Sequence, residues 1–342
     1  MQSLSAGEGD AASGWVNITE GFTREIGVYD ARHDYERRCL GMAVVPTGEI
    51  FIQTLTKGVC VSADQGGTWA VVQGNKITGR CATGFNFSIA YPYDGRLALF
   101  CQDGNGGITP DGGKTWKPFA KIIRSFEFAD VDWGTREPKT IFGLLHEPFY
   151  TVLSTDGGNT WQHAYPSADA LWATIRDQRF ATNYCLGVID ATTLVRAHPA
   201  QGGIAMSVDA GKTWTEVSNY KVLGRRPVHY GKKVFWTTSE GVIVTTNGRD
   251  WSLTGKGPAN AVHGPFFGAS EQEFMVVSDK AFFLTKDGGK TWADVAPAFF
   301  PPDARTPGFS ANALNNYFGW DPARNILYAS SLGGSVYLLR VK

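Results

Sequence analysis

Two carboxylates, Asp103 and Glu147, stand in short polar stretches that interrupt β-rich sequence. A pair of carboxylates on either side of a glycosidic bond hydrolyses it, with one acting as the acid and the other as the base or nucleophile. The two groups must stand ~5–5.5 Å apart for retention of configuration, or ~6.5–9.5 Å apart for inversion. Asp103 and Glu147 are therefore the first candidates for a hydrolytic centre.

Other side chains suit a related reaction on an acidic glycan. His146, His198 and Tyr317 are candidates for a base that abstracts a proton, as a polysaccharide lyase requires. Arginine binds a carboxylate with two parallel hydrogen bonds, and tryptophan stacks on a sugar ring. The catalytic candidates are Glu147, Asp103, His146 and Tyr317. The candidate substrate-binding residues are Arg38, Arg80, Trp172, Arg176, His198, Arg225, Arg226, His229, His263 and Arg305.

A recurring phrase shows which elements must position these side chains. It reads S-A-D-Q-G-G-T-W from Ser62 and T-K-D-G-G-K-T-W from Thr285, and we call each copy a box. The six boxes begin at Ser62, Thr109, Ser154, Ser207, Thr245 and Thr285. Their starts lie 38 to 53 residues apart, a period that matches a four-stranded propeller blade of ~40–50 residues.

Each box has the composition of a tight turn between two strands. The acidic side chain can accept hydrogen bonds from backbone groups just after it, glycine supplies positive φ, and tryptophan buries a large ring. The acidic positions are Asp64, Asp111, Asp156, Asp209 and Asp287, and the shorter fifth box has Asn247 instead. We predict that these residues hold turns and take no part in catalysis.

The box pattern S/T-x-D-x-G-x-T-W resembles the Asp-box, or BNR repeat, and the resemblance covers essentially the whole chain. It implies an all-β fold, a β-propeller of four-stranded antiparallel blades. Asp-box propellers include sialidases, xyloglucan-cleaving glycosidases, sortilin-type receptors and photosystem assembly factors. The resemblance therefore implies a fold and leaves the function open.

Blade counting predicts a seven-bladed β-propeller that forms one domain over residues 1–342, with 1–13 as a flexible tail. Six units each contain a box, and a seventh, from Tyr317 to Val341, has three strands and no box. We expect the strand at Trp15–Thr19 to complete the seventh blade, which would leave no open sheet edge. The alternative is six blades with an irregular C-terminal tail.

The up-and-down order of strands in a blade predicts two different faces. The boxes join the third and fourth strands and share one face with the turns between the first and second strands. The long polar loops lie on the opposite face, where ligands bind in propellers of the resembled family. We therefore expect the candidate residues at that loop face, over the central channel, although polar residues also collect in ordinary solvated loops.

The run R-C-L-G-M-A-V-V-P-T-G-E-I-F, from Arg38, resembles the start of a sialidase in part. In sialidases such an arginine belongs to a triad that grips the substrate carboxylate. Here the expected R-I-P is Arg38-Cys39-Leu40, and the next strand lacks a second arginine and an acidic residue. Arg225, Arg226 and Arg305 are possible partners for Arg38. These departures argue against a true sialidase.

Composition excludes some classes of partner. Lys plus Arg equals Asp plus Glu at 32 each, so the sequence has no basic footprint for nucleic acid or for an anionic membrane surface. We expect an oligo- or polysaccharide as the partner, no nucleic acid, no membrane, a monomer, no cofactor and no metal. The polar N-terminus does not resemble a signal peptide, which suggests a cytoplasmic protein or a chain that begins at a mature end. We take a secreted or periplasmic location as the expectation.

Two questions stay open from the sequence. Cys39, Cys81 and Cys185 occupy similar places in their blades, and small packing residues, a disulfide or a metal link with His229 or His263 would each explain them. The function is either that of a carbohydrate-active enzyme, chiefly a glycoside hydrolase with a lyase as its variant, or that of a non-catalytic propeller for binding, sorting or assembly.

Overall fold

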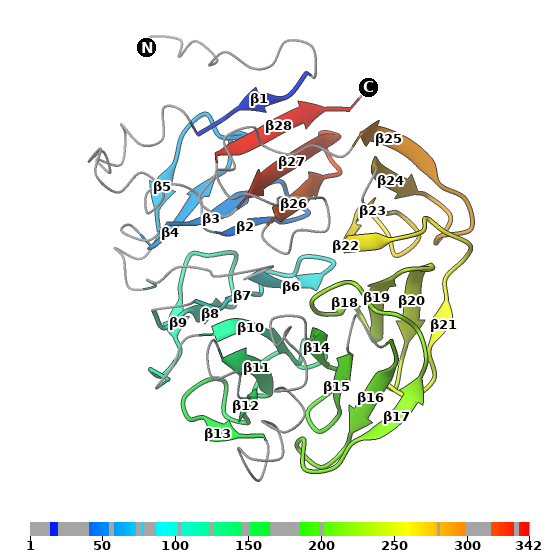
Figure 1. The fold of residues 1–342 in the computed structure, drawn as a ribbon. Coiled ribbons are helices and arrows are strands. Elements are labelled where there is room, and N and C mark those ends of the chain that lie inside the picture. The colour runs from blue at the N-terminus through cyan, green and yellow to red at the C-terminus, as the bar shows by residue number, and fades with distance from the viewer. Residues whose placement is uncertain are drawn as a thin grey trace.

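The structure, a computed structural model, consists of β-strands and connecting turns (Figure 1). It describes residues 14–19, 41–54, 58–72, 77, 87–101, 104–122, 126–145, 151–164, 185–197, 202–278, 281–297, 316–331 and 335–341. These residues form twenty-eight strands and no helix. Among them, accordingly, there is no helix that is long and apolar enough to span a membrane.

Five of the sheets have four strands each and are arranged about a common centre, which is the architecture of a β-propeller (Figure 1). The first contains β2 (Gly41–Val44), β3 (Ile50–Thr54), β4 (Gly58–Ser62) and β5 (Ala70–Val71). The next contains β10 (Phe126–Val131), β11 (Ile141–Leu145), β12 (Thr151–Ser154) and β13 (Gln162–His163). A third contains β14 (Cys185–Val188), β15 (Leu194–Ala197), β16 (Ile204–Ser207) and β17 (Thr215–Ser218). Another contains β22 (Ala261–Phe267), β23 (Phe274–Ser278), β24 (Ala281–Thr285) and β25 (Ala293–Pro297). The last contains β26 (Asn316–Asp321), β27 (Ile326–Ser331), β28 (Val336–Arg340) and β1 (Val16–Asn17).

The remaining eight strands form a single sheet, which differs from the expected set of seven separate four-stranded sheets. One half contains β6 (Phe87–Tyr91), β7 (Leu97–Leu99), β8 (Gly107–Thr109) and β9 (Lys117–Pro118). The other half contains β18 (Val228–Tyr230), β19 (Lys233–Thr238), β20 (Gly241–Thr245) and β21 (Ser252–Leu253). The halves join because β6 and β18 pair in parallel, with Ala90 opposite His229 and Tyr91 opposite Tyr230. Two innermost strands therefore meet at the centre of the molecule.

The ends of the chain meet in the last sheet, as the sequence predicts. β1 pairs antiparallel with β28, and Val16 lies opposite Leu338 (Figure 1). Beyond the strand, Ile18 N–H donates to the Val336 carbonyl at 2.9 Å, and Val336 N–H donates to the Thr19 hydroxyl at 3.0 Å. Residues 16–19 thus supply the fourth strand that the C-terminal segment lacks.

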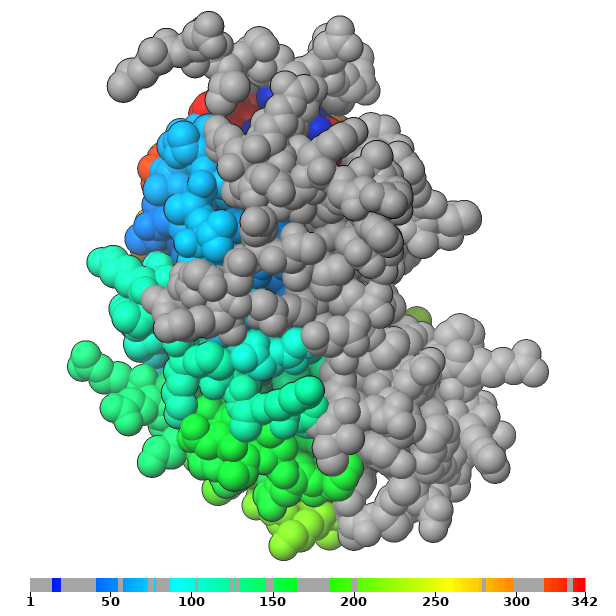
Figure 2. Space-filling view, turned by 90° about the vertical axis from the view of Figure 1, so that its left-hand side faces the viewer, coloured from blue at the N-terminus to red at the C-terminus, as the bar shows by residue number. Residues whose placement is uncertain are grey.

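The hydrophobic core lies between neighbouring sheets. Successive residues of a strand point to opposite faces, so β2 contributes to two clusters. Met42 and Val44 pack against the last sheet, whereas Ala43 packs with Phe87 and Leu97 of the sheet that follows. In Figure 2, the segments 41–72, 87–122 and 126–164 follow one another down one flank of the molecule. Each sheet thus buries both of its faces against its neighbours in the ring.

The boxes are the tight turns that the sequence predicts. In the last box, Asp287 Oδ1 accepts from Thr291 N–H at 2.9 Å, and its Oδ2 accepts from the Thr291 hydroxyl at 2.6 Å. The Thr285 hydroxyl donates to Asp287 Oδ1 and accepts from Gly289 N–H. Corresponding acidic side chains accept the same kind of bonds at Asp64, Asp111, Asp156 and Asp209. Each box is therefore held by its own side chains.

The shorter fifth box keeps this function with an amide. Asn247 Oδ1 accepts from Asp250 N–H at 2.9 Å, and Asn247 Nδ2 donates to Asp250 Oδ2 at 2.8 Å. The Trp251 indole N–H donates to the Gly248 carbonyl at 2.8 Å. An amide can replace the carboxylate here because the shortened turn brings the Asp250 carboxylate within reach of the amide N–H of Asn247.

Backbone hydrogen bonds show on which face of the ring the boxes lie. Gly157 N–H donates to the Lys139 carbonyl, and Gly288 N–H donates to the Gln272 carbonyl, both at 2.9 Å. Lys139 lies between β10 and β11, and Gln272 lies between β22 and β23. These bonds place the boxes on the same face as the turns between first and second strands. We call this the box face and the opposite one the loop face.

Replacement of Trp15 by alanine should destabilise the ring by about 3–5 kcal/mol, because a large buried ring is lost. The Trp15 side chain is 2% exposed, and its ring centroid lies 6.0 Å from that of Phe282 in the neighbouring sheet. The change in the free energy of unfolding is measured by urea denaturation. Val208→Ala, at a valine that is 62% exposed, is the control and should shift stability by no more than about 0.5 kcal/mol. Equal effects of both substitutions would contradict a closing role for residues 15–19.

The boxes should make stability depend on acidic pH. Hydrogen bonds from threonine side chains and backbone N–H groups lower the pKa of Asp156, Asp209 and Asp287 from 3.8 to about 2. Because the folded pKa is lowered, this stabilisation is present above pH 4 and is lost as the pH falls towards 2. Asp287→Ala should therefore weaken the protein in urea at pH 6, and the difference from the unsubstituted protein should shrink near pH 2.

A matched pair of variants identifies the bond. Thr291→Ser keeps the hydroxyl that donates to Asp287, and Thr291→Val removes it. In the serine variant the free energy of unfolding should fall between pH 6 and pH 2 as it does in the unsubstituted protein. In the valine variant this fall should be smaller. A constant effect of Asp287→Ala from pH 6 to pH 2 would show that the carboxylate charge does not stabilise the box.

Candidate functional site

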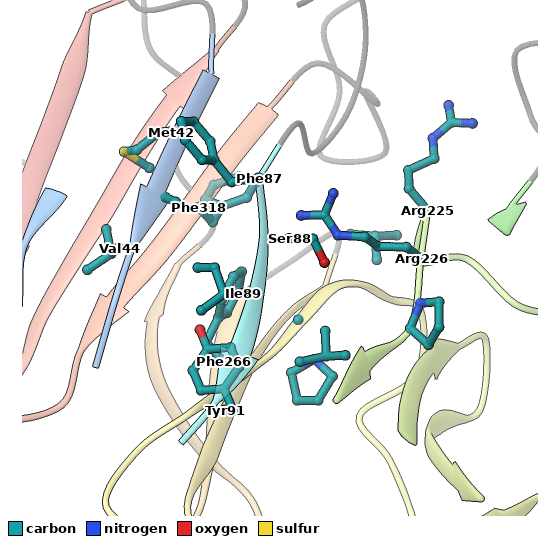
Figure 3. Close-up of a pocket in the computed structure, with 17 residues that line it drawn as sticks. Met42, Val44, Phe87, Ser88, Ile89, Tyr91, Arg225, Arg226, Phe266 and Phe318 are labelled. Atoms are coloured by element: carbon teal, nitrogen blue, oxygen red, sulfur yellow. The ribbon is translucent and has the colours of Figure 1, made fainter. Parts of the chain in front are cut away.

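A pocket lies at the centre of the ring, where inner strands approach one another (Figure 3). Its walls come from β2, β6, β22, Phe318 of β26 and the segment 224–228 that leads into β18. The space available to the centres of water-sized spheres is about 50 Å³. A single water needs roughly 10–15 Å³ on this measure, so the pocket has room for several waters or for a small chemical group.

Two adjacent arginines, Arg225 and Arg226, line this pocket. They precede β18, and inner strands run from the loop face to the box face, so both stand near the loop-face end. The Arg225 carbonyl accepts from Leu186 N–H at 3.1 Å, which ties the segment to β14. At Gly187, an added Cβ would lie 2.2 Å from the ring of Pro227. The absence of a side chain at Gly187 thus lets the arginine-bearing segment approach β14.

The two guanidinium groups point in different directions. Figure 3 shows Arg226 directed towards β6, near Phe87 and Ser88, and Arg225 directed away from Arg226. Arg225 is buried and Arg226 is half-buried. Burial lowers the pKa of Arg226 to about 10, partly opposed by the negative charge of Asp130 and by Tyr91. Arg226 therefore keeps its positive charge at neutral pH in a poorly solvated position.

A buried carboxylate stands behind the arginines. Asp130 of β10 is fully buried; its Oδ1 accepts from the Ser88 hydroxyl at 3.0 Å, and its Oδ2 accepts from Val188 N–H at 2.9 Å. The His229 Nε2 atom lies 3.6 Å from Asp130 Oδ2. The Trp133 indole N–H donates to the Ser88 oxygen at 2.8 Å. Asp130 thus links β6, β10, β14 and β18 and supplies negative charge beside Arg226.

The two described histidines among the candidates are buried side chains near the centre. Burial, together with the positive charge of Arg225, lowers the pKa of His263 to about 3, so its imidazole is neutral at physiological pH. The His263 ring lies 4.9 Å from that of Phe318. His229 is 3% exposed and faces Asp130. Neither histidine is among the residues that line the pocket.

Tyr317 does not lie at an accessible site, as a catalytic base or nucleophile must. Its side chain is fully buried in the cluster between the first and last sheets, with Met42, Val44 and Tyr328. It does not line the central pocket. This position favours a packing role for Tyr317 over that of a base or nucleophile.

Most of the other candidates fall on loops that the structure does not describe. The catalytic candidates Asp103, His146 and Glu147 lie outside the described residues. The same holds for Arg38, Arg80, Trp172, Arg176, His198 and Arg305. The ends of the strands before them are described: β7 ends at Leu99 and β11 at Leu145. Both strands end towards the loop face, because the turns before them belong to the box face.

The described cysteines are buried thiols. Cys60, Cys101 and Cys185 are buried, and Cys39 and Cys81 lie outside the described residues. Burial raises the pKa of Cys101 and Cys185 to about 12, so these thiols stay protonated at neutral pH. Within the described part of the chain, no three His, Cys, Asp or Glu side chains are grouped as a metal site would need. This arrangement suits small packing residues.

Asp130, Ser88 and Tyr91 belong to this centre and are absent from the sequence-based candidates. Asp130 carries the one signal that a sequence offers, a carboxylate within the β-rich run F-E-F-A-D-V. A carboxylate in such a strand must find partners when it is buried. Ser88 and Tyr91 lie in an ordinary β-rich run and carry no comparable signal.

Comparison with known proteins supports the fold. No protein-family model matches the sequence, and a search of curated proteins finds no match. Among solved structures, the chain is similar to the β-propeller domain of Cps50 (Swd1) from Myceliophteria thermophila, with TM-score 0.53, 11% identity, and 90% of this chain and 97% of that one covered. It is similar to a streptogramin B lyase, with TM-score 0.52, 10% identity, and 90% and 94% covered. It is also similar to a chain of a mitotic checkpoint complex, with TM-score 0.53, 11% identity, and 100% and 99% covered. At these identities the likeness establishes a β-propeller and no activity.

Proposed function

We propose that this chain is a carbohydrate-active propeller of the Asp-box type, a glycoside hydrolase that acts on an acidic glycan at the loop face. One observation carries the proposal: Arg225 and Arg226 line the central pocket near the end of the inner strands that is opposite to the boxes. Adjacent guanidinium groups at a concave site favour a carboxylate or another anion. An acidic sugar over the centre would meet this positive charge first.

The chemistry is assigned to the loops that follow the second strands. Asp103 follows β7 and Glu147 follows β11, and both strands end towards the loop face. In this proposal the two carboxylates flank the glycosidic bond, one as general acid and the other as base or nucleophile. His146 is adjacent to Glu147 and would serve as the base if the reaction is an elimination. Arg38, Arg80, Arg176, His198, Arg305 and Trp172 complete the proposed glycan surface.

A non-catalytic binding propeller is the second candidate, and the lining of the pocket favours it. Among the described residues that line the pocket there is no Asp or Glu, and most side chains are apolar. Fold similarity does not choose, because the similar structures include a lyase and a chain of a mitotic checkpoint complex. Such a propeller would bind a glycan or a protein through the same arginines and would not turn it over.

We further infer that the eight-stranded sheet consists of two blades joined at β6 and β18, which gives seven blades in all. Each half is antiparallel and carries one box between its third and fourth strands, as the separate blades do. The parallel pair involves only two residues on each side. We also propose that the protein acts as a monomer in a secreted or periplasmic location.

Incubation with acidic and neutral oligosaccharides tests the hydrolase. Products should form from uronate-containing chains, and Glu147→Gln and Asp103→Asn should each lower kcat by about 10²–10⁴, the usual contribution of a general acid or base. Asp64→Asn, in a box on the opposite face, is the control and should keep kcat. Chromatography measures the products, and absorbance in the ultraviolet reports the unsaturated ends that a lyase makes.

Other outcomes decide between the candidates. Full activity of both carboxylate variants would refute their catalytic role. Unsaturated products would assign the chain to the lyases. Saturable binding of an acidic glycan without any product would support the binding propeller instead.

A further inference from the structure

The central pocket combines two arginine side chains with a largely apolar wall. Met42, Phe87, Ile89, Phe266 and Phe318 supply much of that wall. Figure 3 shows Tyr91 and Phe266 at one end and Arg226 directed towards the β6 wall. A sugar carries a hydroxyl group on most of its carbons, and such a wall offers those groups few partners, so burial there would be unfavourable. The lining itself selects a ligand with apolar surface.

The polar groups of the pocket select an anion. Arg226 is half-buried, and it is attracted by Asp130, whose two oxygens are occupied by the Ser88 hydroxyl and Val188 N–H. Ser88 also lines the pocket, but its hydroxyl donates to Asp130 and its oxygen accepts from Trp133. Ser88 therefore has no proton to offer a ligand. Arg225 also lines the pocket but points away from Arg226 (Figure 3), so the guanidinium of Arg226 is the group placed to meet a carboxylate on the β6 side.

The position of these groups follows from the strand pair at the centre. The parallel register places Ala90 opposite His229, which brings Ser88 level with Pro227 and next to Arg226. Alternation along β18 then turns His229 to the Asp130 side and Val228 to the pocket side. The pairing thus divides the centre into a polar cluster on one side and the amphipathic pocket on the other.

The pocket has room for a small chemical group. Its volume of about 50 Å³ corresponds to roughly four waters. A short acid of about six non-hydrogen atoms is comparable in size to these waters. We therefore take a short monocarboxylate as the ligand class.

We propose that the central pocket binds a small free monocarboxylic acid with an apolar body, whose carboxylate pairs with Arg226 and whose hydrocarbon lies against Ile89, Phe266 and Phe318. This inference goes beyond glycan recognition. It shares the arginines of the central pocket with the proposed function. Its test concerns the pocket itself, whereas the test of the hydrolysis concerns carboxylates in the loops. Each can fail while the other stands.

Titration of the full chain with butyrate tests the proposal, by calorimetry and by ligand-observed NMR. Butyrate should bind at least tenfold more tightly than butan-1-ol, which lacks the charge, and than glycolate, which lacks the apolar body. N-acetylleucine imitates the carboxyl end of a peptide and should bind more weakly, because its amide would be buried without partners. Tighter binding of N-acetylleucine would assign the pocket to peptide ends and overturn the free-acid proposal.

Variants locate the site. Arg226→Gln should weaken butyrate at least tenfold, and Arg226→Lys should weaken it less, since it keeps the charge and loses the fork. Arg249→Gln removes the same charge from an exposed position in the fifth box and should leave the affinity unchanged. Ile89→Ser, at a half-buried wall position, should reduce the preference for butyrate over glycolate.

Two further results would overturn the proposal: equal affinity for butyrate and glycolate, or unchanged butyrate affinity in Arg226→Gln. Thermal unfolding of each variant shows whether it is folded. If Arg226→Gln does not fold, Arg226→Lys and Ile89→Ser replace it in the test. Unchanged butyrate affinity in Arg226→Lys together with unchanged selectivity in Ile89→Ser would then overturn the proposal.

Discussion

Closure of the ring is the constraint on which the rest of the structure depends. Each sheet buries both faces against its neighbours, so an incomplete last sheet would expose a strand edge and part of a hydrophobic cluster. The two paired residues of β1 prevent this, with Trp15 against Phe282 on one side and Ile18 in the cluster of the first and last sheets on the other. A very short segment therefore holds together sheets from both ends of the chain.

Much of this architecture can be predicted from the boxes, because a box acts locally. Asp287 and Thr291 are four residues apart, so their bonds form whenever the local chain folds. The same pattern predicts the same turn in five boxes, and a shortened form of it predicts the turn at Asn247. The strand on each side of a box follows from it, and so do the face of the turn and the missing fourth strand of the last sheet. These predictions needed no knowledge of distant contacts.

The centre of the molecule could not be predicted in this way. The pairing of β6 with β18 joins residues that are far apart in the sequence, and neither Ala90 nor His229 marks its partner. The hydrogen bonds of Asp130 with Ser88 and Val188 also join residues that are far apart in the sequence. Arg225 and Arg226 were recognisable as charged candidates, but the separate directions of their side chains are seen only in the fold (Figure 3). The sequence shows that these two arginines are present, but only the fold shows which groups surround their side chains.

The electrostatics of the centre explain why such a site can exist inside a propeller core. Two guanidinium groups in a poorly solvated space would be unfavourable without compensation. Asp130 supplies one negative charge, and the neutral state of His263 avoids a further positive one. An anion beside Arg226 would add a second favourable charge interaction to that of Asp130. Because Arg226 faces the pocket and Asp130 is engaged by Ser88 and Val188, that anion is best placed in the pocket, where apolar walls strengthen its attraction to the guanidinium.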